Sequence, residues 1–547
     1  MSDWTPPAPG PWQQDSAHAP CSQTAAMRAL YPDGFNRGFT ETFARYGLLL
    51  DRLAMAQVNG FTYHQPQPFD MPGPDGPMSP DQIGAEFGRR AALAEETFAV
   101  KRWRQDLALW DNECKPASIK RHRELGDVDI AGLDDESLAE HLEHVSAHVT
   151  AMVYQHHRFN MGAMLPVGDL AIHFAGWADM PPTAVLGVLD GYSPISGVTS
   201  SEMTEALAAI RADPAASALV TGSGDAGARL DQLRAAVPAV NEYVRSVQDR
   251  VLDGFDIVSP TLREQPAVIM GKLGAALVAD PHAARKRADQ LAADLRARVP
   301  DEHRAEFDEL VGEARAVYRL RDERGIFSEI TAIGLLRRAL LEVGKRAADR
   351  GAIDNPTTML EATPEEAALV LGGAGPTGDA LAERGELRRR LTAEGAPRHL
   401  GPPPPPPPPV DGLPPALGRM MSSIGFMIES ILGQLDASAG DETVIRGIGI
   451  TDKIYEGPAR LVSDIDDLLD LEEGEVIVTP TTGEAFNSVL HLVAGIVTNH
   501  GSHACHAAIV AREMGFPAVV GTVNATTRIK TGDRVRVDGA KGEITLL

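Results

Sequence analysis

The chain has 547 residues, too many for a single hydrophobic core, and about two to four domains are expected. Its net charge of −25, with no long Lys/Arg run, argues against nucleic acid and anionic membranes as partners. No apolar run approaches the length of a membrane-spanning helix, and the first residues lack the basic start and apolar core of a signal peptide. Three scattered cysteines make neither a disulfide framework nor a metal site. These features predict a cytoplasmic protein.

Residues 1–400 predict a mostly helical domain. A helical period over Phe35 to Val58 predicts the first helix, and the Pro-rich stretch Gln65 to Pro80 an ordered loop or lid. Helical patterns continue from Pro80 to about Asn160, whereas the apolar residues 161–200, broken by Gly and Pro, suit the wall of a pocket. Further helices are predicted at Ser201–Ala212, Ala226–Asp253, Pro281–Val299, Asp301–Gly344 and Asp379–Glu394.

Residues 401–440 predict a linker followed by an amphipathic helix. Pro402 to Pro409 would form an extended rod of roughly 25 Å. The apolar stripe from Leu417 to Leu435 needs a surface to pack against. From there the pattern changes, and residues 441–547 predict one compact α/β domain. Its expected strands are Val444–Ile450, Ala459–Val462, Glu475–Val478, Leu490–Thr498, Ala518–Val520, Arg534–Val537 and Glu543–Leu547, with a helix at His506–Met514.

One histidine, His506, opens that apolar helix directly after a short Gly/Ser loop. The N-terminus of a helix presents free backbone N–H groups and the positive end of the helix dipole, which suits phosphate binding. Neutral imidazole offers one nucleophilic nitrogen and forms a labile bond to phosphorus. The pattern therefore predicts a histidine that carries phosphate from one site to another, and the alternative is an ordinary helix-capping histidine.

The segment Thr498-Asn-His-Gly501-Ser-His-Ala-Cys-His506-Ala-Ala-Ile-Val-Ala-Arg512 resembles the signature of the phosphohistidine swivelling domain. That domain occurs in the family of pyruvate phosphate dikinase, phosphoenolpyruvate synthase and rifampin phosphotransferase. Gly457-Pro-Ala-Arg-Leu-Val and Gly474-Glu-Val-Ile-Val-Thr-Pro are similar to it in order and spacing, so that the resemblance covers residues 441–547. It implies that His506 is the phosphorylated residue.

Two features depart from the family pattern. The family usually has two glycines where Gly501-Ser502 stand, and its early Ser-Pro-Gly turn is replaced by Thr451-Asp-Lys. Cys505 fits, because the family has a small Ser or Cys there. The expected phosphate loop therefore consists of Gly501, Ser502 and Cys505, with Arg512 either adding positive charge or lying on the surface.

The acceptor side of the predicted site is less defined. His18, His173 and Trp177 are candidates for lining an acceptor pocket or removing the proton of the acceptor, although any one of them is more often a structural residue. The segment Tyr318–Gly325 resembles the substrate-binding region of rifampin phosphotransferase, so Arg319, Arg321 and Arg324 are candidates for meeting the phosphoryl group. Surface salt bridges are the alternative for these three arginines. His141, His144 and His148 share a helical face that we expect to be packed or solvated, and no metal site is predicted.

No ATP-grasp domain and no phosphate-binding loop is recognisable in the sequence. The arrangement resembles the substrate-and-histidine subunit of two-component aryl phosphate synthases. That resemblance implies an ATP-grasp partner subunit that binds ATP and Mg²⁺ while this chain binds no cofactor itself. It also implies release of AMP and phosphate, and an aromatic hydroxyl such as a phenol or alkylphenol as acceptor. Two alternatives are a component of a rifampin-type antibiotic phosphotransferase and a non-catalytic phosphocarrier or regulatory protein.

Overall fold

The computed structural model describes residues 4–16, 18–19, 21–72, 76–193, 200–252, 254–391, 395–403, 409–432, 443–463, 467–468, 470–483, 486, 489–490 and 492–547. The chain divides into two compact units, each assembled from three stretches of sequence. Unit 1 comprises Met1–Ala163, Asp249–Thr261 and Glu323–Met421, and unit 2 comprises Met164–Gln248, Leu262–Asp322 and Ser422–Leu547. The boundaries expected at residues 400 and 440 do not coincide with this division, and an independently moving C-terminal domain stays a prediction.

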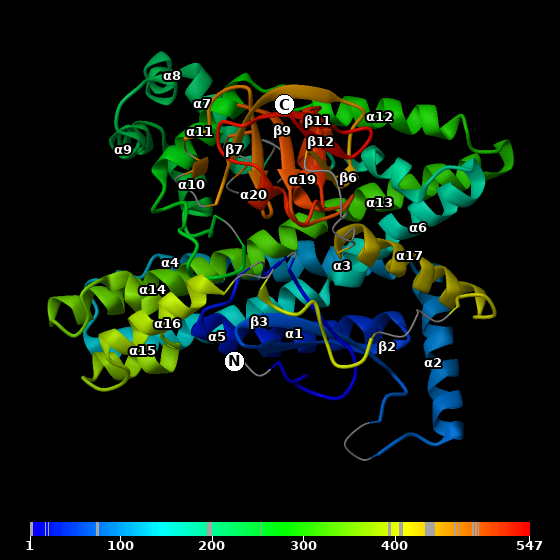
Figure 1. The fold of residues 1–547 in the computed structure, drawn as a ribbon, viewed down its shortest axis with the longest axis horizontal. Coiled ribbons are helices and arrows are strands. Elements are labelled where there is room, and N and C mark those ends of the chain that lie inside the picture. Colours follow the sequence, from blue (N-terminus) through cyan, green and yellow to red (C-terminus); the bar gives the residue numbers. More distant parts are fainter. Residues whose placement is uncertain are drawn as a thin grey trace. The chain divides into compact units, whose positions relative to one another are not determined.

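The fold class is the predicted one, a multidomain chain with a mainly helical N-terminal part and an α/β region at its C-terminus (Figure 1). Within the described residues, no helix has both the length and the apolar character needed to cross a membrane. Residues 404–408, most of the proline run, lie outside the described residues, as do 433–442 and 194–199. The extended rod therefore stays a prediction.

The helical core of unit 1 is built on α1 (Ala25–Tyr46) and α5 (Asp135–Arg158), which pack along each other (Figure 1). A Cβ atom at Gly34 would lie 2.5 Å from the carbonyl oxygen of Thr150, and one at Gly38 would lie 2.8 Å from that of Tyr154. These two glycines share one face of α1 because they are four residues apart, and they let the two backbones approach closely. The core also includes residues of α14 (Thr331–Asp349), and its buried members include Tyr31, Phe35, Leu138, Leu142, Val145, Leu336 and Leu340.

A four-stranded sheet in unit 1 corrects the prediction of a long first helix. α1 ends at Tyr46 and is capped by Gly47 with φ of 80°, and the chain then forms a hairpin of β2 (Leu50–Val58) and β3 (Phe61–Pro68). The turn residues Asn59 and Gly60 both have positive φ, 51° and 85°. Asn-Gly is the strongest short hairpin signal, and it outweighs the helical spacing of the neighbouring apolar residues. The sheet has the order β2-β3-β1-β4, with β1 at Trp12–Gln14 and β4 at His399–Leu400.

Most of the remaining helices of unit 1 lie in stretches that were predicted to be helical, whereas α15 (Pro364–Leu371) was not predicted. They are α2 (Pro80–Ala99), α3 (Arg102–Leu109), α4 (Lys115–Gly126), α14 (Thr331–Asp349), α15 (Pro364–Leu371) and α16 (Gly378–Arg390). Two segments of π-helix interrupt this regular structure, η1 at Trp110–Cys114 and η4 at Ile326–Ile330. A π-turn is rare and is often found at functional positions.

The stretch 161–200 also differs from the prediction, because its first half is helical. α6 covers Asn160–Ala178 with Pro166 inside it, and η2 (Pro182–Leu189) follows. Within unit 2, a Cβ atom at Gly168 would lie 2.2 Å from the carbonyl oxygen of Ser423 in α17 (Pro415–Leu432). Gly168, one of the small residues that suggested an irregular pocket wall, therefore allows α6 and α17 to pack closely. Phe174 of α6 and Met427 of α17 belong to the same apolar core.

Besides α6 and α17, unit 2 contains further helices, the last of which, α13, runs on into unit 1. They are α7 (Ser201–Ala212), α8 (Pro214–Thr221), α9 (Ala226–Ala236), α10 (Pro238–Val247), α11 (Pro266–Val278), α12 (Ala283–Arg296) and α13 (Arg304–Gly325). The predicted helix from Ala226 to Asp253 is two helices, because Pro238 starts a new one. The helix expected at Pro281–Val299 is α12, which is shorter at both ends, and Asp280 is not its N-cap. His282 occupies that position, and its N–H donates to the Asp280 carboxylate.

The C-terminal sheet has eight strands in the order β5-β12-β11-β7-β8-β9-β10-β6. Its strands are β5 (Val444–Arg446), β6 (Ile448–Gly449), β7 (Ile454–Leu461), β8 (Glu475–Thr479), β9 (Val493–Thr498), β10 (Ala518–Val520), β11 (Arg534–Asp538) and β12 (Glu543–Leu546). Strands β7, β8, β9 and β10 run parallel to one another, and the other pairings are antiparallel. Helix α19 (His506–Met514) lies between β9 and β10 in the chain, at the predicted residues.

Candidate functional site

His506 stands at the carboxyl end of the parallel strands of unit 2. β8 and β9 are neighbouring parallel strands that end at Thr479 and Thr498, and the loop after β9 leads directly into α19. Ligands of parallel sheets bind beyond the carboxyl ends of the strands, where loops and helix N-termini meet. The Oγ1 atom of Thr482, in the loop after β8, lies 2.8 Å from Nδ1 of His506 and shares a hydrogen bond with it. Two adjacent strands therefore fix the imidazole from two sides.

Sequence reasoning did not identify Thr482. The available signal was its position, three residues beyond the last paired residue of a buried strand and before a glycine, where side chains of parallel sheets converge. A threonine hydroxyl can accept or donate, so the hydrogen bond to Thr482 is compatible with a ring that carries its proton on Nδ1. With Nδ1 protonated and donating to Thr482, the lone pair of the neutral ring lies on Nε2.

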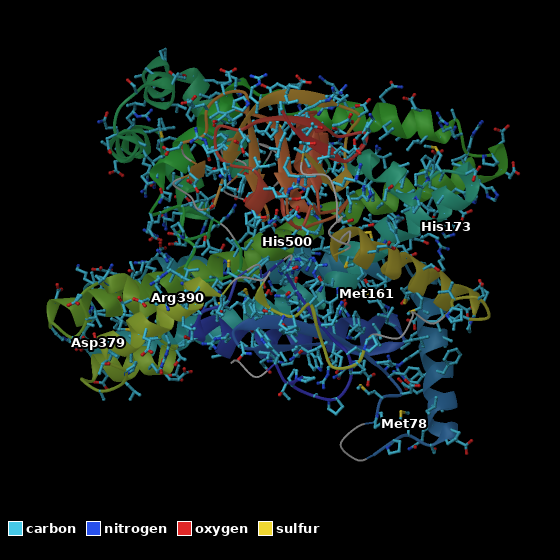
Figure 2. The ribbon with its side chains drawn as sticks, in the orientation of Figure 1. Met78, Met161, His173, Asp379, Arg390 and His500 are labelled. Carbon is cyan, nitrogen blue, oxygen red and sulfur yellow. The ribbon has the colours of Figure 1, made fainter. Side chains whose placement is uncertain are left out.

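The other histidines of the loop are held differently. His500, labelled in Figure 2, is buried, its N–H donates to the carbonyl oxygen of Pro480 at 3.0 Å, and its own carbonyl oxygen accepts from Thr498. His503 is half-buried, and burial lowers the pKa of its ring. His506 is the loop histidine that stands at the first position of the helix.

Gly501 is required by the shape of the loop. Its φ is 108°, and a Cβ atom there would lie 2.7 Å from Sγ and 2.9 Å from Cβ of Cys505. Cys505 is the N-cap residue of α19 in an extended conformation, and burial raises the pKa of its thiol, which keeps the sulfur uncharged. The side chain of Cys505 therefore fills the space beside Gly501, and both residues shape the start of the helix.

The two departures from the family pattern have structural explanations. Among the described residues, those with positive φ include Gly501 but not Ser502, so the second position accommodates a side chain. Ser502 is buried, and its carbonyl oxygen accepts from the N–H of Cys505 at 3.1 Å. Thr451 donates from Oγ1 to the carbonyl oxygen of Phe516 at 3.1 Å, which ties the altered turn to the residues after α19.

Arg512 supports the loop from the far end of α19. Its Nη1 donates to the carbonyl oxygen of His503 at 2.8 Å, and its Nε lies 3.4 Å from the carboxylate of Asp190. The next residue, Glu513, accepts from the N–H of Gly191 at 2.9 Å, and its carbonyl oxygen accepts from Arg287. Burial raises the pKa of Asp190 to about 6 and that of Glu513 to about 7. Direct contact of Arg512 with phosphate stays a prediction.

The three arginines of α13 do not form one group. Arg321 belongs to unit 2 and binds Asp322 through Nε at 2.8 Å and Nη2 at 2.6 Å. Arg319 is half-buried in the same unit. Arg324 belongs to unit 1, is buried, and donates from Nη1 to the carbonyl oxygen of His156 at 3.3 Å. Arg321 thus forms a salt bridge, which is the alternative stated for these arginines. Contact of any of the three with a phosphoryl group stays a prediction.

The predicted acceptor residues also fall in different units. His173, labelled in Figure 2 on α6, lies in unit 2 with its Nδ1 3.1 Å from Oδ1 of Asp169. Trp177 of the same helix stacks on His303 with 5.0 Å between ring centroids. His18 lies in unit 1, half exposed, with Nδ1 3.1 Å from both carboxylate oxygens of Asp15.

The histidines of α5 are partly packed and partly solvated. His141 and His148 are buried, burial lowers the pKa of both rings, and His144 is exposed. Over the part of the chain that the structure describes, no group of His, Cys, Asp and Glu side chains has the arrangement of a metal site.

Two parts of the chain match known families. Residues 471–542 match the PEP-utilising enzyme, mobile domain, and residues 161–322 match the rifampicin phosphotransferase fourth domain. A phosphoenolpyruvate synthase of Aquifex aeolicus (strain VF5) is 47% identical over 103 residues, which is 19% of this chain and 12% of that protein. Chondramide synthase cmdD of Chondromyces crocatus is 28% identical over 334 residues, 57% of this chain and 8% of that protein.

An uncharacterized phosphotransferase, YvkC of Bacillus subtilis (strain 168), is 28% identical over 248 residues, covering 45% of this chain and 27% of that protein. The chain therefore spans only a small part of the length of each of these relatives. It contains phosphotransferase-family domains, including the mobile domain of PEP-utilising enzymes with His506 inside the matched residues.

Proposed function

We propose that the chain is a phosphotransferase component in which His506 accepts a phosphoryl group and passes it to the hydroxyl group of a small aromatic acceptor. The observation that supports this most directly is the placement of His506. It starts α19 at the carboxyl ends of two parallel strands, with Nδ1 held 2.8 Å from Thr482, inside the residues that match the mobile domain. A helix-capping residue alone needs no such fixed ring.

The chemistry follows from the orientation of the ring. With the proton on Nδ1, Nε2 carries the lone pair that attacks phosphorus, and the phosphorus–oxygen bond of the donor breaks as the new bond to nitrogen forms. The positive end of α19 stabilises the negative charge of the phosphoryl oxygens. Transfer to the acceptor reverses these changes, because the bond between phosphorus and nitrogen breaks and the ring nitrogen recovers its electron pair.

The donor side belongs to a partner in this proposal. An ATP-grasp subunit would bind ATP with Mg²⁺ and phosphorylate His506, with release of AMP and inorganic phosphate, as in the family that the C-terminal region resembles. The chain would then alternate between the donor on the partner subunit and its own acceptor. Separate pockets for donor and acceptor become possible because a covalent intermediate connects them.

The experiment is to incubate the full chain with an ATP-grasp candidate subunit and ATP labelled at the β-phosphate. The expected result is acid-labile label on the chain, absent from His506→Ala and retained in His503→Ala, the matched control from the same loop. Label that persists in His506→Ala overturns the proposal. Peptide mapping of the labelled chain identifies the modified residue in either case.

A second candidate function has one observation in its favour. Residues 161–322 match a rifampicin phosphotransferase domain, which supports an antibiotic acceptor in place of a simple phenol. Single-turnover transfer from the phosphorylated chain to phenol, alkylphenols and rifampicin distinguishes the two. A phosphorylated chain that transfers to none of these compounds, yet exchanges its phosphoryl group with a partner protein, is the outcome expected of a phosphocarrier.

A further inference from the structure

Unit 1 contains a connected group of ionisable side chains that the phosphohistidine chemistry does not use. We call it the histidine cluster, and its members are Asp15, His18, Tyr31, His64, His156, His157 and Glu329. We propose that the histidine cluster is the acceptor site, where His18 takes the proton from an aromatic hydroxyl. This proposal rests on the proposed function, and it names the site and the base that the proposed function leaves open.

The cluster consists of two groups in close contact with Phe35, whose ring centroid lies 4.9 Å from that of His64 in one group and 4.4 Å from that of His157 in the other. Nδ1 of His64 lies 3.7 Å from the Asp15 carboxylate that also binds His18. Tyr31 donates to Oε2 of Glu329 at 3.2 Å, and its hydroxyl is 3.4 Å from Nε2 of His157. These distances join residues from α1, β3, α5, η4 and the segment after β1.

The interior of the cluster contains the carboxyl group of Glu329. Nδ1 of His156 lies 2.7 Å from Oε1 of Glu329, which is fully buried within the π-turn η4. Burial raises the pKa of Glu329 to about 8, so that this carboxyl group is mostly neutral near neutral pH. Burial also lowers the pKa of His156 and His157, which keeps both rings uncharged.

A purely structural role explains this arrangement poorly. Burying ionisable groups costs free energy unless every polar atom is satisfied, and an apolar core of the same volume is at least as stable. Nε2 of His64 is buried and lacks a hydrogen-bond partner within the described residues. Perturbed ionisable groups gathered with an unsatisfied polar atom are typical of a binding or catalytic site. The π-turn that carries Glu329 is a second feature of such sites.

Aromatic rings surround the polar groups and favour an aromatic ligand. The ring of His64 stacks on Phe35 with 4.9 Å between centroids, and that of His157 stacks on Phe39 at 5.1 Å. Phe255, half-buried, lies 6.1 Å from His18 and 6.4 Å from His156. Apolar ring faces next to a few fixed polar atoms suit a planar ligand with one hydroxyl group.

His18 has the geometry of a general base. Its Nδ1 faces both carboxylate oxygens of Asp15 at 3.1 Å, which fixes the proton on Nδ1 and leaves Nε2 to accept one. The side chain is 48% exposed while that of Asp15 is buried, so the dyad combines a fixed orientation with access from solvent. Asp15 acts here as a positioning residue.

In the transfer step, one bond to phosphorus forms as another breaks, and one proton moves. The acceptor hydroxyl loses its proton to Nε2 of His18, and its oxygen forms the bond to phosphorus. The bond between phosphorus and the His506 nitrogen breaks, and its electron pair returns to that imidazole. A phosphate monoester leaves, and His18 returns its proton to solvent.

The test uses the full chain and compares His18→Ala with His173→Ala. His173 is the matched control because its Nδ1 also lies 3.1 Å from an aspartate carboxylate oxygen, and because it is the rival acceptor candidate in unit 2. We expect both variants to become phosphorylated on His506. We expect transfer to phenol to fall about 10²- to 10⁴-fold in His18→Ala and to stay near wild type in His173→Ala. Loss of transfer in His173→Ala with retention in His18→Ala overturns the proposal.

Positioning by Asp15 has its own readout, the pH profile of transfer. The Asp15 carboxylate raises the pKa of His18, while burial and the charge of Arg324 oppose that rise. His64 faces the same carboxylate, and Glu329 adds to the rise only in its ionised form. Asp15→Asn should shift the rise of the transfer rate to lower pH, because the base then titrates at lower pH. An unshifted profile contradicts the positioning role.

A binding measurement separates this proposal from the proposed function. Binding of 4-fluorophenol to the unphosphorylated chain, followed by ¹⁹F NMR, requires no phosphoryl transfer. We expect Phe39→Ala to weaken it at least severalfold, and His173→Ala to leave it unchanged. Binding that disappears in His173→Ala, or that is equal in Phe39→Ala and wild type, contradicts the site. A chain that binds the probe at this site but never becomes phosphorylated refutes the proposed function alone.

Discussion

Replacing Gly501 with alanine tests whether the loop shape positions His506. Two costs add at this residue. An L-residue at φ of 108° is strained by about 1–3 kcal/mol. The new Cβ atom would also lie 2.7 Å from Sγ of Cys505, and relieving such overpacking costs about 1–3 kcal/mol more. We therefore expect Gly501→Ala to destabilise the loop by roughly 2–6 kcal/mol and to displace Cys505, the N-cap of the helix that begins with His506.

Gly515→Ala is the matched control. Gly515 ends the same helix with φ of 82°, but a Cβ atom there meets nothing within 4 Å, so that only the backbone strain applies. We expect this variant to lose about 1–2 kcal/mol and to retain the geometry of the loop. The difference between the two variants isolates the contact with Cys505.

The assay is the rate at which a thiol reagent labels Cys505, mapped by mass spectrometry in a Cys21→Ser background, together with thermal unfolding. Burial raises the pKa of the Cys505 thiol and makes it slow to react in the wild type. Gly501→Ala should accelerate labelling by at least an order of magnitude, whereas Gly515→Ala should change it little. Equal labelling rates and equal stability losses in the two variants refute the steric reasoning.

Three further predictions concern single side chains. Thr482→Val should slow phosphorylation of His506 about five- to tenfold, because a bond worth about 1 kcal/mol that orients Nδ1 is lost, whereas Thr482→Ser should keep the rate. The pKa of Glu513 is raised in the folded chain, so the folded state binds this proton more tightly than the unfolded state does, and the free energy of unfolding falls as pH rises from about 4.5 to about 7. Glu513→Gln should therefore reduce the pH dependence of the unfolding temperature across that range. Trp110→Phe should lower the free energy of unfolding by about 1–3 kcal/mol, because Nε1 of Trp110 donates to the buried Glu323 carboxylate at 2.8 Å. Calorimetry measures this loss, and an unchanged unfolding temperature contradicts it.

Local signals sufficed for the C-terminal region. The apolar runs around β8, β9 and β10 and the helix His506–Met514 are predicted nearly at their observed bounds, because each is a short buried element between clear turn residues. The error at Phe35 to Val58 has a different origin. The helical spacing of the apolar residues continues past Gly47, and only the Asn59-Gly60 turn marks the change to strands.

The distant parts of the sites could not be predicted from spacing. Thr482 lies 24 residues before His506, and the two meet only because β8 and β9 are adjacent and parallel. Similarly, Tyr31 and Glu329 are 298 residues apart in sequence. Conversely, His18 and His173 look alike as single residues, but they belong to different compact units. Pairing across a sheet or between helices is tertiary information, which one sequence does not contain.

The most direct test of the central claim is a single turnover with the phosphorylated chain and no ATP. The chain is first phosphorylated by the partner subunit, then freed of nucleotide and mixed with phenol, and both the phosphohistidine and the product are followed by ³¹P NMR. We predict that the signal of phosphorylated His506 disappears as an equal amount of phenyl phosphate forms. Loss of the phosphohistidine signal to inorganic phosphate alone, at the same rate with and without phenol, would contradict the account.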